Sequence, residues 1–251
     1  MRRCIELASK NVGYTYPNPL VGSVIVCDNK IIGEGSHEKY GESHAEVNAI
    51  NSVKDKGLLK NSTLYVNLEP CNHYGKTPPC TEAIINNNIK KVVIGSQDPN
   101  KLVNGSGIEK LRSSGCNVSV GIMDKECDEL NKRFFTYHKL KRPFIILKWA
   151  ESNDGFISPI KSINTLKKVN WISGEDAKKL SHKWRSEEHS ILVGVQTIID
   201  DDPILTTRFV EGRSPIRFVL DPSSRIPIDS RILSDNVKTC LLYTSDAADD
   251  W

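Results

Sequence analysis

Three residues that can bind a metal ion, His44, Cys71 and Cys80, fall at the ends of expected helices and strands. His44 opens one helix, Cys71 follows a proline at the end of a strand, and Cys80 follows a proline and opens a second helix. A metal ion can bind all three only in a fold that brings one strand end and two helix starts together.

Hydrophobic periodicity predicts such a fold in the first part of the chain. Strands are expected at 20–27, 30–37, 62–70, 90–100 (with a loop at its end) and 116–122, and helices at 1–11, 45–54, 80–87, 107–115 and 125–140. The first two strands form a hairpin that turns at Asp28, Asn29 and Lys30. Because helices separate the later strands, crossover connections and a largely parallel α/β layer are expected.

A second α/β pattern follows a short linker at 141–143, which contains a proline. Its strands are expected at 143–152, 169–174, 189–200 (a strand and following turn), 215–222 and 237–244, with a helix at 175–186. We therefore divide the chain into a domain at 1–140 and an incomplete one at 143–243. Residues 244–251 are acidic and unpatterned, and we interpret them as a tail outside the native reading frame.

Composition excludes several classes of protein. The chain has 251 residues, a net charge of +3 and no dominant block of Lys and Arg, so a nucleic-acid partner is not expected. No apolar run approaches the roughly 18 residues that a membrane span needs, and the N-terminus lacks the apolar core of a signal peptide. Seven cysteines without an export signal favour the reducing cytoplasm, where metal ligation or burial is expected rather than disulfides.

The metal pattern predicts catalysis. Three protein ligands leave the fourth tetrahedral position of Zn²⁺ open for water, as in catalytic zinc sites. Two Cys thiolates and a neutral His also balance the charge of the ion. Glu46, on the first turn of the helix after His44, can carry a proton from the attacking water to a leaving amine. Zinc nucleobase deaminases have this pattern as H-x-E and P-C-x-x-C, although here eight residues rather than two separate the two cysteines.

Two alternatives remain open at this point. A deaminase of tRNA or single-stranded DNA would share the metal site, but it would also need a basic groove and stacking aromatic residues. In a non-catalytic zinc protein the metal would only staple the fold, and replacing Glu46 by Gln would leave any activity unchanged. The remaining cysteines fall within expected helices or strands and are interpreted as packing residues: Cys4, Cys27, Cys116, Cys127 and Cys240.

The segments "YPNPLVGSVIV", "HAE" and "EPCNHYGKTPPC" together resemble the deaminase half of the bifunctional riboflavin-biosynthesis deaminase-reductases. The segments "LKWAESNDGFIS" and "WISGEDAKKLSHKWRSEEHSILVGVQTIIDDDPILTTR" resemble the reductase half, so the resemblance covers residues 1 to about 240. It implies a cytidine-deaminase-like α/β/α layered domain followed by an incomplete dihydrofolate-reductase-like α/β domain. In that family a long loop separates the two cysteines, as it does here.

The resemblance implies zinc-dependent hydrolytic deamination of 2,5-diamino-6-(5-phosphoribosylamino)pyrimidin-4-one, then NADPH-dependent reduction of the ribosyl group to ribityl. A homo-oligomer is expected from the family alone. Family reductase domains continue for roughly a hundred further residues and supply a glycine-rich loop, so this chain is expected to be a competent deaminase and a poor reductase. A sheet without its last strands would expose edges and apolar faces.

The resemblance also assigns roles to individual residues. In the deaminase half, the substrate-binding positions are Asn18, His37, His73 and Lys76. In the reductase half, the cofactor positions are Ala150, Trp171, Thr197 and Asp201, and the substrate positions are Arg185, Leu205 and Arg208. These residue types suit the substrate, because Lys and Arg bind phosphate and an amide between two prolines has a restricted backbone.

Overall fold

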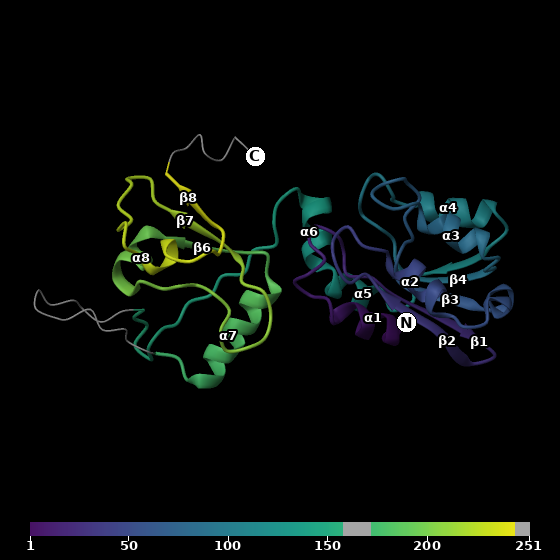
Figure 1. The fold of residues 1–251 in the computed structure, drawn as a ribbon, viewed down its shortest axis with the longest axis horizontal. Coiled ribbons are helices and arrows are strands. Elements are labelled where there is room, and N and C mark those ends of the chain that lie inside the picture. The colour runs from purple at the N-terminus through teal and green to yellow at the C-terminus, as the bar shows by residue number, and fades with distance from the viewer. Residues whose placement is uncertain (158–171, 244–251) are drawn as a thin grey trace, which may run out of the picture. The chain divides into compact units, whose positions relative to one another are not determined.

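A computed structural model describes residues 1–157 and 172–243, drawn in colour in Figure 1. The chain divides into two compact units, residues 1–145 and 146–251, and each is described by itself. Residues 169–171, which are the first half of the strand expected at 169–174 and include Trp171, lie outside the described residues, as does the tail at 244–251. No helix in the described part of the chain combines the length and the apolar character of a membrane span.

The first unit is built on a mixed five-stranded sheet. In sheet order its strands are β2 (Lys30–Ser36), β1 (Gly22–Cys27), β3 (Thr63–Leu68), β4 (Lys91–Ser96) and β5 (Asn117–Val120). Only β3, β4 and β5 run parallel, since β1 is antiparallel to both its neighbours. The predicted hairpin and the parallel arrangement of the later strands are therefore confirmed, and the antiparallel pairing of β1 with β3 joins the two parts. Asp28 and Asn29 turn this hairpin with positive φ angles of 47° and 60°.

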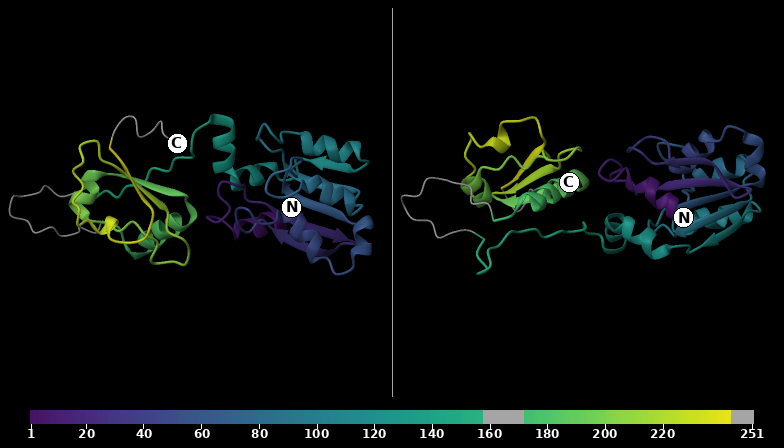
Figure 2. Two further views of the ribbon diagram at one scale, coloured as in Figure 1. Left: turned by 45° about the horizontal axis from the view of Figure 1, so that its top comes forward. Right: turned by 90° about the horizontal axis from the view of Figure 1, so that it is seen from below.

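Helices cover both faces of this sheet and give three layers, which confirms the expected α/β/α arrangement (Figure 2). The helices of the first unit are α1 (Arg2–Ser9), α2 (Ala45–Ser52), the 3₁₀ turn η1 (Lys56–Asn61), α3 (Cys80–Asn86), α4 (Ser106–Ser113), α5 (Asp124–Leu130) and α6 (Lys132–Leu140). The main core lies under α2, α3 and α4, where Ile50, Ile84 and Leu111 pack with the strand residues Leu64 and Ile94. This core fixes the starts of α2 and α3, which carry two of the candidate ligands.

The single helix expected at 125–140 is instead two helices, α5 and α6, which break at Asn131. Asn131 leaves helical geometry, with φ −101° and ψ 18°. Its buried side chain accepts a hydrogen bond from the Leu20 backbone N–H at 2.7 Å and donates to the Leu20 carbonyl at 2.9 Å. The sequence pattern alone predicts one continuous helix. The break comes from the hydrogen bonds of Asn131 with Leu20, which is 111 residues away in the sequence.

The second unit has a parallel three-stranded sheet in the order β6-β7-β8. Its elements are α7 (Glu175–Glu187), β6 (Ser190–Gly194), α8 (Val195–Asp201), β7 (Ile216–Leu220), η2 (Arg231–Leu233) and β8 (Thr239–Leu242). The turn expected after β6 is the helix α8, because Val195 and Ile198 face the core of this unit at a spacing of one helical turn.

The strand expected at 143–152 is not formed, and these residues belong to no helix or strand. A strand needs a hydrogen-bonded neighbour, and no described strand pairs with this segment. Its apolar side chains are consequently open to solvent: Leu147 is 78% exposed and Trp149 63%. Ile172, Ser173 and Gly174, the described end of the strand expected at 169–174, also lie outside any strand.

Arg217 is a fully buried charge at the centre of the second unit. Its guanidinium makes a bidentate ion pair with Asp235 at 2.6 and 3.0 Å. It also donates to three backbone carbonyls and to the hydroxyl of Thr239. Arg217 therefore ties β7 to the segment that leads into β8.

Candidate functional site

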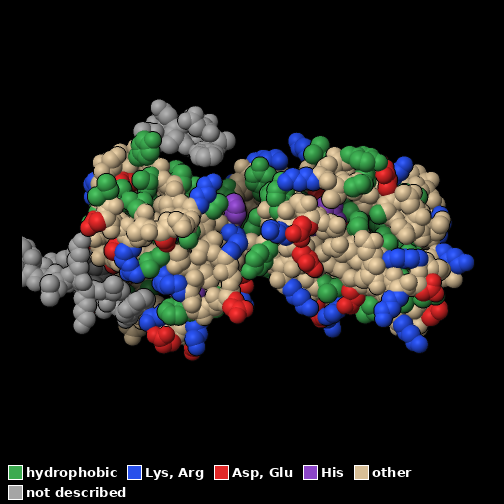
Figure 3. All heavy atoms as spheres, viewed as in Figure 1, with side chains coloured by type: hydrophobic (Ala, Val, Ile, Leu, Met, Phe, Trp, Pro, Cys, Tyr) green, Lys and Arg blue, Asp and Glu red, His purple; other side chains and the backbone are tan. Residues whose placement is uncertain are grey.

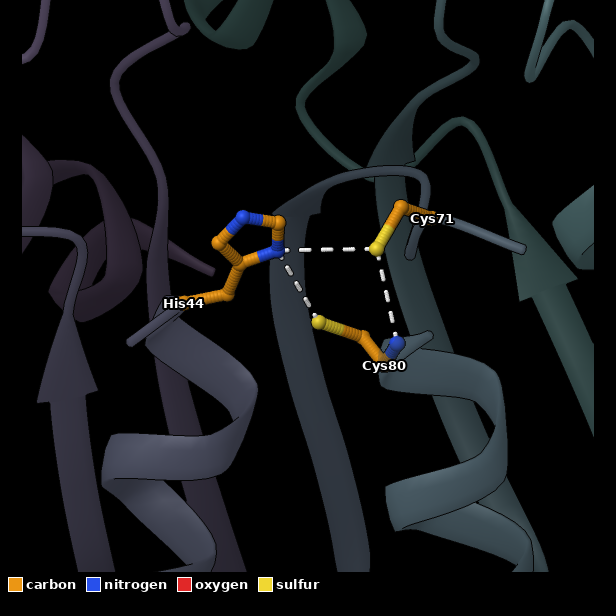
Figure 4. A group of neighbouring side chains, drawn as sticks. All are labelled: His44, Cys71 and Cys80. Carbon is orange, nitrogen blue, oxygen red and sulfur yellow. Dashed lines mark hydrogen bonds between the residues drawn. The ribbon is translucent and has the colours of Figure 1, made fainter. Parts of the chain in front are cut away.

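The three expected metal ligands converge in the first unit (Figure 4). His44 is the N-cap of α2, Cys71 follows β3, and Cys80 is the first residue of α3. The Nδ1 atom of His44 lies 3.2 Å from the Sγ of Cys80 and 3.5 Å from the Sγ of Cys71. All three ligand atoms lie within 4.8 Å of one another.

This donor set fits zinc. Zn–S and Zn–N bonds of about 2.3 and 2.0 Å place the ligand atoms of a tetrahedral ion roughly 3.5 to 3.8 Å apart, close to the His44–Cys71 and His44–Cys80 distances. The Cys80 side chain and backbone N–H hydrogen-bond to the sulfur of Cys71 and lower the pKa of Cys71 to about 4. The same contact with Cys71, together with burial, raises the pKa of Cys80. A divalent cation between the sulfurs would stabilise both thiolates.

Glu46 lies beside this group and is only 3% exposed. It stands on the first turn of α2, two residues after His44, and lines the same cavity. Burial, and then the charge of Cys71, raises the pKa of Glu46. A carboxyl group with a raised pKa can hold a proton near neutral pH and also release it, as a general acid and base requires.

A cavity of about 270 Å³ opens above the three ligands. Glu46, His44 and Cys71 line it. The four substrate-binding residues expected in this half line it too: Asn18, His37, His73 and Lys76. The structure therefore brings together the residues that the sequence predicted for the deaminase half.

One wall of the cavity is formed by Asn18 and His37. Asn18 lies in the loop before β1, and its Nδ2 is 3.0 Å from the Nε2 of the buried His37. The Nδ1 of His37 lies 3.1 Å from the carbonyl oxygen of Ser43, the residue before His44. Burial lowers the pKa of His37, which favours the neutral ring. The ring also packs edge-on against His44, with centroids 5.3 Å apart.

The loop between the two cysteines, which carries His73 and Lys76, forms another part of the cavity lining. It leaves the site after Cys71 and returns at Cys80, as expected. Lys76 places its ammonium 4.0 Å from the centre of the Tyr40 ring, a cation–π contact. Tyr74 anchors the loop by donating to a carboxylate oxygen of Glu82 on α3 at 2.7 Å.

Sequence reasoning missed several residues around this cavity. Glu69 is 4% exposed, and its carboxylate accepts from the backbone N–H groups of Asp98, Gly105, Gly107 and Ile108 at 3.0 to 3.2 Å. It thereby fixes the loop that brings Asp98 to the cavity, where burial raises the pKa of Asp98 to about 6. The position of Glu69, directly before the Pro-Cys pair, was the only signal in the sequence.

In the second unit, Arg185 and Arg208 share neighbours. Arg185 donates to the backbone carbonyl of Thr206 at 3.1 Å, and Arg208 donates to the Thr206 hydroxyl at 3.0 Å. The buried His182 accepts from the Arg208 backbone N–H at 2.9 Å through Nδ1. Burial, and then the charges of the two arginines, lowers the pKa of His182 to about 4. The pair thus forms a compact cationic group on α7 and the segment before β7.

The other described residues predicted for this unit make no hydrogen bond with the guanidinium groups of Arg185 and Arg208. Leu205 packs its side chain into the core of the second unit and is 6% exposed. Thr197 and Asp201 are exposed on α8, and Ala150 is half-buried in the irregular segment at 143–152.

On the face shown in Figure 3, Lys and Arg side chains over the first unit are interspersed with Asp and Glu rather than gathered in one block.

Each of the two units matches the model of a known protein family. Residues 1–96 match the model of the cytidine and deoxycytidylate deaminase zinc-binding region, and residues 143–251 match that of the RibD C-terminal domain. The riboflavin biosynthesis protein RibD of Aquifex aeolicus is 45% identical over 245 residues, which cover 97% of this chain and 67% of the relative. RibD of Escherichia coli is 37% identical, over 100% of this chain and 70% of the relative.

Solved structures give the same result. A diaminohydroxyphosphoribosylaminopyrimidine deaminase/5-amino-6-(5-phosphoribosylamino)uracil reductase from Thermotoga maritima is 42% identical, with a TM-score of 0.87 over 96% of this chain and 68% of that one. RibD of Acinetobacter baumannii is 36% identical, with a TM-score of 0.87 over 99% of this chain and 70% of that one. The chain spans about two thirds of the length of these relatives.

Proposed function

This chain belongs to the RibD family of riboflavin biosynthesis proteins, and from that premise we propose that its first unit is a zinc-dependent hydrolytic deaminase of 2,5-diamino-6-(5-phosphoribosylamino)pyrimidin-4-one. The observation that supports this most directly is the convergence of His44, Cys71 and Cys80 beside a cavity that His44, Cys71 and Glu46 line. Three ligands and an adjacent buried carboxyl are the parts that hydrolytic removal of a ring amine needs.

Each part of the cavity has a role in this reaction. When bound, zinc supplies the Lewis acidity that activates water for attack near neutral pH. Glu46 accepts a proton from the attacking water and delivers it to the departing amine, which leaves as ammonia. Asn18 and His37 orient the pyrimidine from one wall. Lys76, on the loop between the two cysteines, neutralises the substrate phosphate, and His73 on the same loop contacts the pyrimidine or the ribose.

Ammonia release tests this function and separates it from nucleic-acid deamination. The purified chain, loaded with zinc, is given either the phosphoribosyl diaminopyrimidinone or an RNA stem-loop containing adenine and cytosine. We expect ammonia and the aminouracil product from the small molecule alone. Deamination of the RNA with no turnover of the small molecule would instead support the tRNA-deaminase alternative.

For the second unit we propose the reductase role of the family, with NADPH as hydride donor and Arg185 and Arg208 as ligands of the substrate phosphate. The support is the match to the RibD C-terminal domain and the proximity of the two guanidinium groups around Thr206. The positions proposed for NADPH are Ala150, Trp171, Thr197 and Asp201, with Leu205 at the substrate. Oxidation of NADPH in the presence of the deaminated substrate is the test, and an absence of oxidation would contradict the proposed reductase role.

We also propose that the protein is a cytoplasmic homo-oligomer that acts on a small molecule. The measurement is light scattering coupled to size-exclusion chromatography, for which a monomer of 28.1 kDa would contradict the proposal. Fractionation of cells that express the chain would test its location, and we expect recovery in the cytoplasmic fraction.

A further inference from the structure

Two buried amide side chains hold the loop that carries Asn18. The Leu20 backbone N–H donates to the Oδ1 of Asn131 at 2.7 Å, and the Gly22 N–H donates to the Oδ1 of Asn67 at 2.7 Å. The Leu20 carbonyl accepts from the Nδ2 atoms of both asparagines at 2.9 Å. Asn131 is 3% exposed and Asn67 is fully buried. These side chains thus take the place of a neighbouring strand just before β1 begins.

Because of this arrangement, we propose that Asn131 and Asn67 are positioning residues for deamination, which set the place of Asn18 in the cavity. The inference rests on the proposed function of the first unit. Asn18 is two residues before Leu20. Its backbone N–H also donates to the Thr15 carbonyl at 2.8 Å, and its side chain contacts His37. Val21, directly after Leu20, also lines the cavity and accepts from the His37 backbone N–H at 2.9 Å.

Asn131 connects this loop to a second part of the cavity. Its backbone N–H bonds to the Cys127 carbonyl at 3.2 Å and its own carbonyl accepts from Phe135 at 2.9 Å, so it belongs to the ends of both α5 and α6. Phe134, in the first turn of α6, lines the cavity. The break between α5 and α6 therefore serves two purposes, since it turns the Asn131 amide toward Leu20 and begins the helix that brings Phe134 to the substrate.

The geometry requires an amide at this position. Asn131 accepts from the Leu20 N–H through Oδ1 and donates to the Leu20 carbonyl through Nδ2, and a planar amide offers these two roles on separate atoms. Aspartate has the same shape and keeps the acceptor, but it would set a second carboxylate oxygen against the Leu20 carbonyl. Alanine would leave both backbone groups of Leu20 without this partner in a buried position.

A double-mutant cycle tests the proposal. Asn131→Ala, Asn131→Asp, Asn18→Ala and the double variant Asn18→Ala/Asn131→Ala are compared for kcat and KM of ammonia release, well below their melting temperatures. We expect each Asn131 variant to lose about tenfold or more in kcat/KM, mainly through KM, with zinc content unchanged. In the Asn18→Ala background the same change should cost little, because the group that Asn131 positions is already absent.

Asn87→Ala is the matched control, since Asn87 donates to the Ala83 carbonyl at the end of α3 and does not line the cavity. It should keep wild-type kcat/KM. An equal loss from Asn131→Ala in both backgrounds would show that Asn131 acts through general stability and would overturn the proposal. Asn131→Asp keeps the cycle interpretable if the alanine variant folds poorly, because it retains one of the two hydrogen bonds.

Hydrogen exchange supplies a readout that needs no activity. In Asn131→Ala and Asn131→Asp we expect faster exchange in the peptide that covers residues 15–22, with β3, β4 and α3 unchanged. Wild-type protection of that peptide in both variants would contradict the inference. A wild-type chain that releases no ammonia would contradict the proposed function instead, so the two failures are distinguishable.

Discussion

The side-chain amide of Asn18 lies 3.0 Å from the Nε2 atom of His37, and this contact joins two loops that are 19 residues apart. The Nδ1 of His37 lies 3.1 Å from the Ser43 carbonyl, which can only accept, so Nδ1 must carry the ring proton. The Nε2 of the neutral ring is then an acceptor, and the Asn18 Nδ2 donates to it. Asn18 keeps its Oδ1 as an acceptor for a donor group of the substrate.

Replacing Glu46 by Gln separates catalytic from structural zinc. Glutamine has nearly the same shape but cannot exchange protons, so we expect zinc content to stay unchanged while the rate of ammonia release falls by roughly 10² to 10⁴. Metal analysis and a steady-state assay on the same sample measure both. Glu38→Gln, at an exposed position outside the cavity, is the control and should retain activity. Full activity of the Glu46 variant would favour a metal that only staples the fold.

Removal of one thiol should release the metal. We expect about one zinc ion per wild-type chain, and its loss in Cys80→Ser, because the remaining donors are too few for a tight site. Ammonia release should stop with it, and the melting temperature of the first unit should fall, since bound metal stabilises the folded state. Cys240→Ser in β8 should retain both zinc and activity. A Cys80→Ser chain with a full complement of zinc would contradict the assigned ligands.

Glu69→Gln should destabilise the first unit although the change is isosteric. The carboxylate accepts four backbone hydrogen bonds. The amide nitrogen of glutamine cannot accept a hydrogen bond, so two of the four buried backbone N–H groups lose their acceptor. We expect a loss of about 2 to 3 kcal/mol in the free energy of unfolding, measured in urea. Glu109→Gln, at an exposed position on α4, should change it by less than about 0.5 kcal/mol.

Arg217→Met should unfold the second unit and leave the first intact. The substitution removes the bidentate pair with Asp235 and every donor that the guanidinium gives to nearby backbone carbonyls. Each backbone carbonyl that is left buried without this donor costs about 1 to 3 kcal/mol. All four tryptophans lie in residues 146–251, so their fluorescence reports this unit. We expect a shifted emission maximum, rapid proteolysis after about residue 145 and unchanged zinc content, whereas loss of zinc would show that the units depend on each other.

His182 should make the second unit less stable in mild acid. Burial lowers the pKa of His182 to about 4, below the value near 6.5 expected in the unfolded chain. Between these pH values the unfolded state binds more protons, so stability is full above about pH 6.5 and declines as pH falls toward 4. Unfolding followed by tryptophan fluorescence at several pH values measures the slope. In His182→Asn this slope should be smaller, and an unchanged slope would mean that other groups cause it.

The elements that position the metal ligands were predictable because they depend on local signals. The strand before Cys71 contains the strand-favouring run Leu64, Tyr65 and Val66, and Pro79 marks the start of α3 within one residue. His44 and Glu46 are two apart in sequence, so a helix start fixes their relation before any tertiary contact forms. For the same reason the residue types alone indicated zinc and a proton carrier.

Features that depend on distant contacts could not be read from the sequence. The break at Asn131 exists because its amide bonds Leu20, and the role of Glu69 exists because the loop after β4 folds over it. The pairing of β1 against β3 likewise comes from sheet assembly rather than from any local pattern. The strand expected at 143–152 had the right residue types, but a strand forms only beside a hydrogen-bonding neighbour.

The eight residues between Cys71 and Cys80 join a strand and a helix of the core at their two ends, and the Tyr74–Glu82 hydrogen bond ties them to α3 in between. Insertions or exchanges in such a segment leave the ion-holding groups where they are. Changes in this segment can therefore alter which substrate binds without altering the metal ligands. Enzymes with different substrate specificities could arise from a common ancestor through sequence changes in this short segment.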